Sequence, residues 1–125
     1  MQKRESLYSK HPDYRVDLES NPSRVVVSLA GTVIADSEKT LLVRETNLGP
    51  VVYFPKADVR FDQLEATRHE THCPFKGDAS YWTARVGERV EENAVWGYED
   101  PYDEVAGLRD YVSFYQDRFE WGEGQ

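Results

Sequence analysis

Cys73 is the only cysteine of the chain and the first side chain whose type could support covalent chemistry. It precedes Pro74 and lies shortly before Lys76. A nearby ammonium group favours the thiolate, which is the nucleophilic form of cysteine. Nucleophilic catalysis also needs a base held by a third group, and His69 or His72 could be that base. An isolated cysteine is more often a small buried hydrophobe, so a structural or ligand-lining role is the alternative.

The same segment contains residue types that bind zinc. His69, His72 and Cys73 could be joined by Glu70 as a fourth ligand. The spacing is unfavourable, because adjacent residues of an extended chain point to opposite faces and structural zinc sites usually combine two short motifs. The sequence contains no CxxC, HExxH, GxGxxG, P-loop or GxSxG motif. We therefore expect no metal site and no cofactor.

Arg44 and Glu45 follow the apolar residues 41–43, which predict a strand. Because adjacent strand residues point to opposite faces, at most one of these two charges easily faces the core. A charge that points inward must be paired or must line a cavity, and Asp58 and Lys76 are the candidate partners. The alternative is one exposed charge and one surface ion pair, which adds little stability.

The chain is rich in aromatic residues, with eight tyrosines, five phenylalanines and three tryptophans. Such rings could form the walls of a pocket and stack on a flat or cationic ligand. The alternative is an aromatic core, in which each buried tyrosine hydroxyl needs a hydrogen-bond partner. The rings considered for either role are Tyr53, Tyr81, Trp82, Trp96, Tyr98 and Tyr115.

Short strands must position these side chains, because β-branched and alternating segments recur along the chain. Tyr14, Val16 and Leu18 alternate with charged residues, and Gly31 lies at the turn of a predicted hairpin. Pro55 ends a further strand because it has no N–H group for the sheet. We predict an antiparallel meander in the first half of the chain. The expected strands are 14–18, 25–29, 32–35, 41–45, 51–54, 79–86 and 94–98.

Other segments have weaker patterns. Residues 57–64 are expected to contain a helical turn, and residues 69–77 have no clear period and are interpreted as a loop. Near the C-terminus the apolar residues fit helical spacing, whereas the aromatic and β-branched content favours a strand. We predict a turn at 103–106 followed by a strand, and a loose tail over 121–125.

The length of 125 residues indicates one domain. We divide the chain into a polar N-terminal extension (1–13), a single β-rich domain (14–121) and a flexible tail (122–125). The net charge of −8 argues against nucleic acid and anionic membranes as partners. One cysteine permits no internal disulfide. The first residues are too polar for a signal peptide, and no apolar run approaches the about 20 residues of a membrane span, so we expect a cytoplasmic location.

A series of short motifs gives the sequence a specific resemblance. The motifs are GTVIADS (31–37), RET (44–46), VYFPKADV (52–59), THCPFKGDASYW (71–82), AVWGYEDP (94–101) and YVSFYQDRFEW (111–121). In this order they resemble the domain of unknown function 427 family. The resemblance extends from Tyr14 to Trp121, which is nearly the whole chain.

The resemblance implies a mainly β fold: a single compact antiparallel domain of the Mss4-like, or β-tent, group, with at most short helical turns. Members of that group often bind zinc through paired cysteine motifs, which this sequence lacks, and others hold small ligands in aromatic cages. The family has no established activity for the resemblance to supply. Its motif positions correspond here to Arg44, Glu45, Tyr53, Asp58, Cys73, Lys76, Gly77, Tyr81, Trp96 and Tyr98.

Our first hypothesis is a small-molecule binding domain with a polar, aromatic-walled pocket. Arg44 and Lys76 would attract an acidic group of the ligand, since a guanidinium fork suits a carboxylate. Tyr53, Trp96 and Tyr98 would form the walls. The candidate ligand-binding residues are Arg44, Glu45, Tyr53, Asp58, Cys73, Lys76, Trp96 and Tyr98.

Two other hypotheses stay open. The protein could be a small enzyme, in which Glu45 or Asp58 is the general base and Cys73 or Lys76 is the nucleophile or acid. It could also be a protein-interaction module without a small ligand, because small β domains can recruit partners by pairing at a strand edge.

Overall fold

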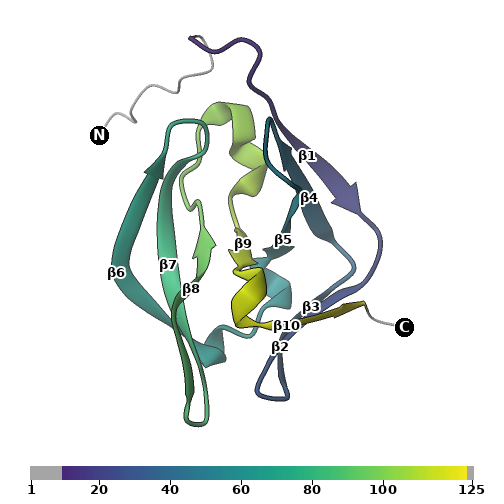
Figure 1. The fold of residues 1–125 in the computed structure, drawn as a ribbon, viewed down its shortest axis with the longest axis vertical. Helices are drawn as coiled ribbons and strands as arrows, with labels where there is room; N and C mark the ends of the chain where they lie inside the picture. The colour runs from purple at the N-terminus through teal and green to yellow at the C-terminus, as the bar shows by residue number, and fades with distance from the viewer. Residues whose placement is uncertain (1–9, 124–125) are drawn as a thin grey trace.

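The computed structural model describes residues 10–123. Within this part of the chain, ten strands form two antiparallel sheets (Figure 1). The larger sheet has seven strands in the order β1-β4-β5-β9-β8-β7-β6, and the smaller sheet has three in the order β10-β2-β3. Helical structure in the described residues consists of short 3-10 turns. The predicted mainly β, antiparallel domain is therefore confirmed, whereas the Mss4-like architecture stays a prediction.

The larger sheet contains β1 (Val16–Asn21), β4 (Thr40–Glu45), β5 (Val51–Pro55), β9 (Tyr111–Phe114), β8 (Arg89–Gly97), β7 (Gly77–Val86) and β6 (Leu64–Cys73). The smaller sheet contains β10 (Glu120–Glu123), β2 (Val25–Leu29) and β3 (Thr32–Ser37). The 3-10 turns are η1 (Lys56–Asp58), η2 (Phe61–Gln63), η3 (Asp103–Leu108) and η4 (Gln116–Arg118).

The hairpin of β2 and β3 leaves the larger sheet, which corrects the prediction of a meander. Ala30 and Gly31 connect the two strands with φ angles of 50° and 81°, and a two-residue type I′ turn requires positive φ at both positions. β1 pairs with β4 instead of β2, and Val16 lies opposite Glu45. Alternation identified the strands because it marks a half-buried segment, but it does not specify the partner strand.

The expected loop at 69–77 is wrong for His69–Cys73, which form the end of β6. This strand pairs with β7, and Cys73 lies opposite Gly77. β6 is an edge strand whose side chains are mostly exposed, and its register with β7 shifts once. A strand without a buried face shows no apolar alternation, so the pattern resembled that of a loop. The short turn between β6 and β7 contains Lys76.

The expected loose tail is wrong for its first residues, because Glu120–Glu123 form β10 and pair with β2. Trp121 lies opposite Val27 and packs against buried residues. This pairing joins the last strand to the second strand of the chain, and no local sequence pattern indicates such a distant contact. Residues 124–125, and residues 1–9 of the expected N-terminal extension, lie outside the described residues.

Two local predictions are confirmed. The turns η1 and η2 provide the short helical structure that was expected around residues 57–64. The turn η3 is followed by β9, so the predicted turn and strand are found there instead of a continuous helix. In the described part of the chain, no helix has the length and hydrophobicity that a membrane span requires.

Two apolar cores lie on opposite faces of the larger sheet, because successive residues of a strand point to opposite sides. Tyr53 belongs to one core and Phe54 to the other. The first core is covered by β2 and β3 and contains Val27, Leu29, Ile34, Ala35, Phe54, Val59, Trp82, Ala84, Ala94, Val95, Val112, Phe114 and Phe119. The second core includes two side chains of η3 and contains Val43, Tyr53, Ala79, Tyr81, Tyr98, Tyr102, Val105 and Leu108.

Candidate functional site

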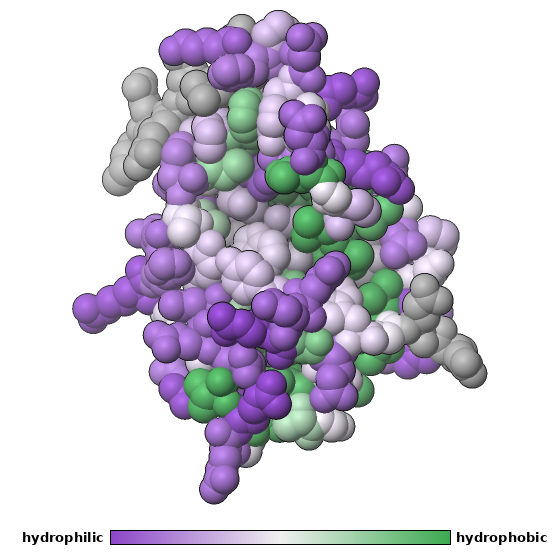
Figure 2. All heavy atoms as spheres, in the orientation of Figure 1, coloured by the Kyte–Doolittle hydropathy of each residue, from purple (hydrophilic) through white to green (hydrophobic). Residues whose placement is uncertain are grey.

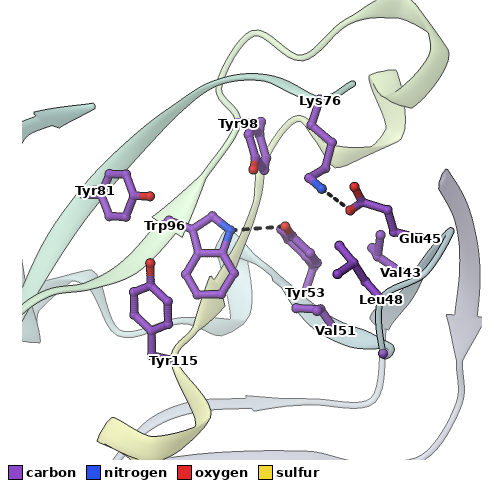
Figure 3. A pocket seen from close by; sticks show the side chains of 11 residues that line it. Val43, Glu45, Leu48, Val51, Tyr53, Lys76, Tyr81, Trp96, Tyr98 and Tyr115 are labelled. Atoms are coloured by element: carbon purple, nitrogen blue, oxygen red, sulfur yellow. Dashed lines mark hydrogen bonds and ion pairs between the residues drawn. The ribbon is translucent and has the colours of Figure 1, made fainter. Parts of the chain in front are cut away.

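A cavity of about 250 Å³ opens at the second core, and we call it the aromatic pocket (Figure 3). Its walls come from β4, β5, β7 and β8, from the turns after β4 and β6, and from the segments after β8 and β9. On the face shown in Figure 2, pale side chains of intermediate hydropathy lie between hydrophobic ones and a strongly hydrophilic border. The pocket is lined by Val43, Glu45, Leu48, Gly49, Val51, Tyr53, Lys76, Tyr81, Trp96, Tyr98 and Tyr115.

An ion pair between Glu45 and Lys76 lies on one side of the pocket (Figure 3). Each of these two side chains is only 10% exposed. Oε1 of Glu45 accepts a hydrogen bond from the Lys76 ammonium, and Oε2 accepts one from the Tyr14 hydroxyl. Both carboxylate oxygens therefore have a partner. This satisfies the requirement that a buried charge be paired and hydrogen-bonded.

The backbone around Lys76 fixes the position of its side chain. The Lys76 N–H donates to the carbonyl of Cys73 over 3.3 Å, and the Lys76 carbonyl accepts from the Tyr102 N–H over 3.1 Å. The next residue, Gly77, has a φ of 115°, which favours glycine. A Cβ atom at Gly77 would lie 3.4 Å from the Asp100 carbonyl oxygen. That distance is an ordinary van der Waals contact, so the positive φ, and not a lack of space, is the reason for glycine at this turn.

Aromatic rings form much of the rest of the wall, together with Val43, Leu48 and Val51. Trp96 Nε1 donates to the Tyr53 hydroxyl over 3.2 Å, and the two rings meet edge to face. The ring of Tyr115 lies 4.6 Å from that of Trp96, centroid to centroid. The Tyr81 hydroxyl bonds to the Thr71 hydroxyl over 2.9 Å. These contacts hold the rings in fixed orientations, as a preformed binding site requires.

The hydrogen-bonding capacity that remains in the pocket consists mainly of donors. An ammonium group has three N–H donors, and Glu45 uses one of those of Lys76. The Tyr53 hydroxyl accepts from Trp96, so its own proton is still available. Among residues 10–123, the Tyr98 hydroxyl has no hydrogen-bond partner, and it points toward the middle of the pocket (Figure 3). The site is therefore suited to a ligand that accepts hydrogen bonds.

The local environment keeps the tyrosines protonated. Burial raises the pKa of Tyr53 above its usual value, although the hydrogen bond from Trp96 acts in the opposite direction. Burial also raises the pKa of Tyr98. For Tyr115, burial is the largest cause of a raised pKa, and a hydrogen bond with Tyr81 adds to it. At neutral pH these hydroxyls are neutral donors.

The structure brings together five of the eight residues predicted from the sequence, namely Glu45, Tyr53, Lys76, Trp96 and Tyr98. Tyr81, a family motif position, also lines the pocket. The sequence analysis did not assign Tyr115 or Leu48 to the site. Tyr115 stood out only as one of many aromatic residues. Leu48 is 61% exposed in the turn after β4. The sequence feature that could have identified it is an apolar residue within a polar turn, three residues after Glu45.

Arg44 and Asp58 do not lie in the pocket. Arg44 points to the other side of β4, where Nε bonds to Oε2 of Glu19 over 2.8 Å, and both side chains are about half exposed. Asp58 accepts a hydrogen bond from the Ser37 hydroxyl over 2.6 Å and lines a separate surface depression. The structure therefore does not bring Arg44 or Asp58 to the pocket that Lys76 lines.

Cys73 packs against the second core and is partly buried, but it does not line the pocket. Its candidate bases have other contacts. Nδ1 of His72 bonds to Asp78 over 2.8 Å, and the ring of His69 lies 4.5 Å from that of Tyr81. Within the described ranges, no group of three or more His, Cys, Asp or Glu side chains is arranged to hold a metal ion.

Comparison with known proteins agrees with the motifs of the sequence. A model for a protein family described as a domain of unknown function (DUF427) matches residues 17–123. The match runs from the second residue of β1 to the end of β10 and so includes every residue that lines the pocket. No curated protein matches the sequence.

Proposed function

The chain belongs to the DUF427 family, and we propose that its aromatic pocket binds a small molecule in which a flat ring carries an acidic group. The observation that supports this proposal is the excess of unused donors in a pocket with no free carboxylate oxygen. Lys76 and Tyr98 offer N–H and O–H groups, and both oxygens of Glu45 already have partners. A carboxylate on the ligand would accept these hydrogen bonds.

The aromatic walls are suited to the ring of such a ligand. Trp96 and Tyr115 form a tilted pair, and Tyr53 meets Trp96 at 82°. Aromatic rings prefer offset-stacked and edge-to-face contacts, so a flat ligand ring would gain contacts with both kinds of wall. The net charge of −8 supports a small ligand over nucleic acid or an anionic membrane. A cytoplasmic location is part of the proposal.

Calorimetric titration with benzoate at pH 7 tests the proposal, with neutral benzamide as the matched ligand. Benzoate should bind at one saturable site and more tightly than benzamide. A double variant, Glu45→Leu with Lys76→Met, removes the ion pair and keeps the aromatic walls. It should bind benzoate at least about tenfold more weakly, because hydrogen bonds to charged groups are worth about 1.5–3 kcal/mol. Arg44→Ala should bind like the parent.

Two results would overturn the proposal. One is the absence of saturable benzoate binding to the folded parent protein. The other is a double variant that binds benzoate as tightly as the parent while its circular dichroism spectrum is unchanged, because the ammonium of Lys76 would then not contact the ligand.

An enzymatic role is the second candidate, and the buried ion pair favours it. Glu45 and Lys76 border the cavity and could transfer a proton to or from a bound molecule. Asp58 and Cys73 are outside the pocket, so they have no part in this version. A small aldehyde with borohydride tests Lys76 as a nucleophile at pH 7. Preferential labelling of Lys76 would support the enzyme, and labelling only of exposed lysines would contradict a nucleophilic Lys76.

A further inference from the structure

Tyr14 lies outside the residues that line the aromatic pocket, but it contacts both sides of the ion pair there. Its hydroxyl donates to Oε2 of Glu45. Its ring stacks on Phe75, the residue before Lys76, with 3.7 Å between the ring centroids and 13° between the ring planes. One side chain therefore bridges the end of β4 and the turn after β6. The family match begins at residue 17, so it does not include Tyr14.

The backbone next to Tyr14 determines where this side chain lies. The Arg15 N–H donates to the Thr46 hydroxyl over 2.8 Å, and the Thr46 N–H donates to the Arg15 carbonyl over 2.9 Å. These two bonds extend the pairing of β1 with β4, in which Val16 lies opposite Glu45. The register of the larger sheet therefore places the Tyr14 hydroxyl beside the Glu45 carboxylate.

The Tyr14 hydroxyl limits what the Glu45 carboxylate can bind. Among residues 10–123, no other group donates to Oε2 of Glu45. A buried acceptor that loses its donor is costly, so it takes another donor where one is near. Without this hydroxyl, Oε2 would compete for a second N–H of Lys76 or would accept a hydrogen bond from the ligand. Both changes reduce the excess of donors that suits the pocket to an acidic ligand.

We propose that Tyr14 is a specificity-determining residue of the aromatic pocket. It acts through Glu45: by bonding to Oε2, it leaves the remaining N–H donors of Lys76 to an acidic ligand and removes an acceptor that a hydrogen-bond-donating ligand would need. This inference rests on the proposed function of the pocket. It adds to the site a positioning residue from the segment before β1, and it explains how a pocket that contains a carboxylate can select an acidic ligand.

The variant Tyr14→Phe tests the inference, because it keeps the ring on Phe75 and removes only the hydroxyl. Benzoate and neutral benzamide are the probes, and benzamide has N–H donors that Oε2 of Glu45 could accept. In the parent protein, benzoate should bind more tightly than benzamide. In Tyr14→Phe, the ratio of the two affinities should fall about tenfold, since a hydrogen bond to a charged group is worth about 1.5–3 kcal/mol and 1.4 kcal/mol is tenfold.

The ratio distinguishes a role in specificity from a role in packing, because a loosened pocket would bind both probes more weakly. Tyr111→Phe is the matched control. Tyr111 is partly buried beside the second core and does not line the aromatic pocket. This variant should keep the affinity ratio of the parent protein.

Urea unfolding tests the contact between Tyr14 and Glu45 without a ligand. In the parent protein, Tyr14→Phe should lower the equilibrium constant for folding about tenfold, because Oε2 loses its donor. In the double variant Glu45→Leu with Lys76→Met, the same change should lower it about twofold or less, because that protein has no carboxylate at position 45.

The outcomes separate this inference from the proposed function. If benzoate binds the parent protein but Tyr14→Phe keeps the affinity ratio, or weakens both probes equally, Tyr14 does not determine specificity and the aromatic pocket stands. If Tyr14→Phe changes the folding constant by the same factor in both backgrounds, its effect does not pass through Glu45 and the inference is wrong. If neither probe binds the parent protein, the proposed function fails and this inference fails with it.

Discussion

The two cores of the protein use different aromatic residues on the two faces of one sheet. The rings of the first core are phenylalanine and tryptophan, and Phe114 packs edge to face against Phe54 and Phe119. The second core contains no phenylalanine among its members, and its buried rings are tyrosines, joined by the partly buried Trp96. The first core is closed by the smaller sheet, whereas the aromatic pocket opens at the second.

We propose that the first core stabilises the fold and that the second core contributes the residues that bind a ligand. A phenylalanine core needs no polar partners, so it can be covered completely. Tyrosine hydroxyls need partners, and in the second core Tyr98 has none among the described residues. The ion pair adds two buried charges, which contribute little to stability in most proteins. Because these polar groups add little to stability, ligand binding explains their presence in the second core better than folding does.

The largest expected effect is the truncation of a ring in the first core. Phe114→Ala should lower the free energy of unfolding by about 3–5 kcal/mol, because it removes a buried ring and leaves a cavity. Tyr115→Ala, the adjacent residue on the other face, should cost about 1 kcal/mol or less, because that side chain is 40% exposed. Urea unfolding measures both. Equal losses of stability in the two variants would contradict the claim that the first core stabilises the fold more than the rings of the pocket do.

The ion pair should produce the next largest effect. Lys76→Met leaves the Glu45 carboxylate buried without its counter-ion and should cost about 3 kcal/mol. Adding Glu45→Leu should recover most of that loss, since a well-packed apolar pair often replaces a buried ion pair without cost. Urea unfolding of the single and double variants checks this. If the double variant is no more stable than Lys76→Met, the pair has a structural role that the proposal does not include.

Alkaline pH should act through the second core. The folded protein holds the protons of Tyr53 and Tyr98 above about pH 10, because burial raises the pKa of each hydroxyl, whereas the unfolded chain releases them. The free energy of unfolding should therefore fall as pH rises above about 10, by about 1.4 kcal/mol per pH unit for each such tyrosine. Tyr98→Phe removes one of these groups, so the free energy of unfolding should fall less steeply with pH, by about 1.4 kcal/mol per pH unit. An unchanged slope in urea unfolding from pH 9 to 11 would contradict it.

The smallest effect is expected at Arg44. Its ion pair with Glu19 is exposed, and such pairs contribute about 0–1 kcal/mol. Arg44→Ala should change the free energy of unfolding by about 0.5 kcal/mol or less and leave benzoate binding unchanged. A loss of binding in this variant would show that Arg44 reaches the ligand and that the side of β4 assigned to it is wrong.

The sequence predicted much of the fold because most of its strands are half buried, and a half-buried strand alternates apolar with polar residues. The strands from Val51, Ala79 and Ala94, and the hairpin at Gly31, follow from alternation and turn residues. The edge strand β6 has few buried side chains, so it was interpreted as a loop. The pairing of β1 with β4 and of β10 with β2 depends on contacts between distant segments, which a local pattern does not contain.

For the site, the family motif identified side chains but not the face on which each one lies. The sequence indicated that at most one of Arg44 and Glu45 faces inward, and the structure shows that it is Glu45. Tyr115 reaches the pocket because β9 pairs with β8 and brings the residue that follows it against Trp96. The position of Lys76 depends on the short turn between β6 and β7. Because residues 69–77 were interpreted as one loop, this turn was not predicted.

The indole N–H signals of the three tryptophans test the central claim most directly. Trp96 lines the aromatic pocket, whereas Trp82 belongs to the first core, on the other face of the sheet. Titration with benzoate, followed by two-dimensional NMR, should move the Trp96 signal along a saturable curve and leave the Trp82 signal in place. Tryptophan-to-phenylalanine variants assign the signals. A Trp96 signal that does not move, or a Trp82 signal that moves as far, would contradict a binding site at the second core.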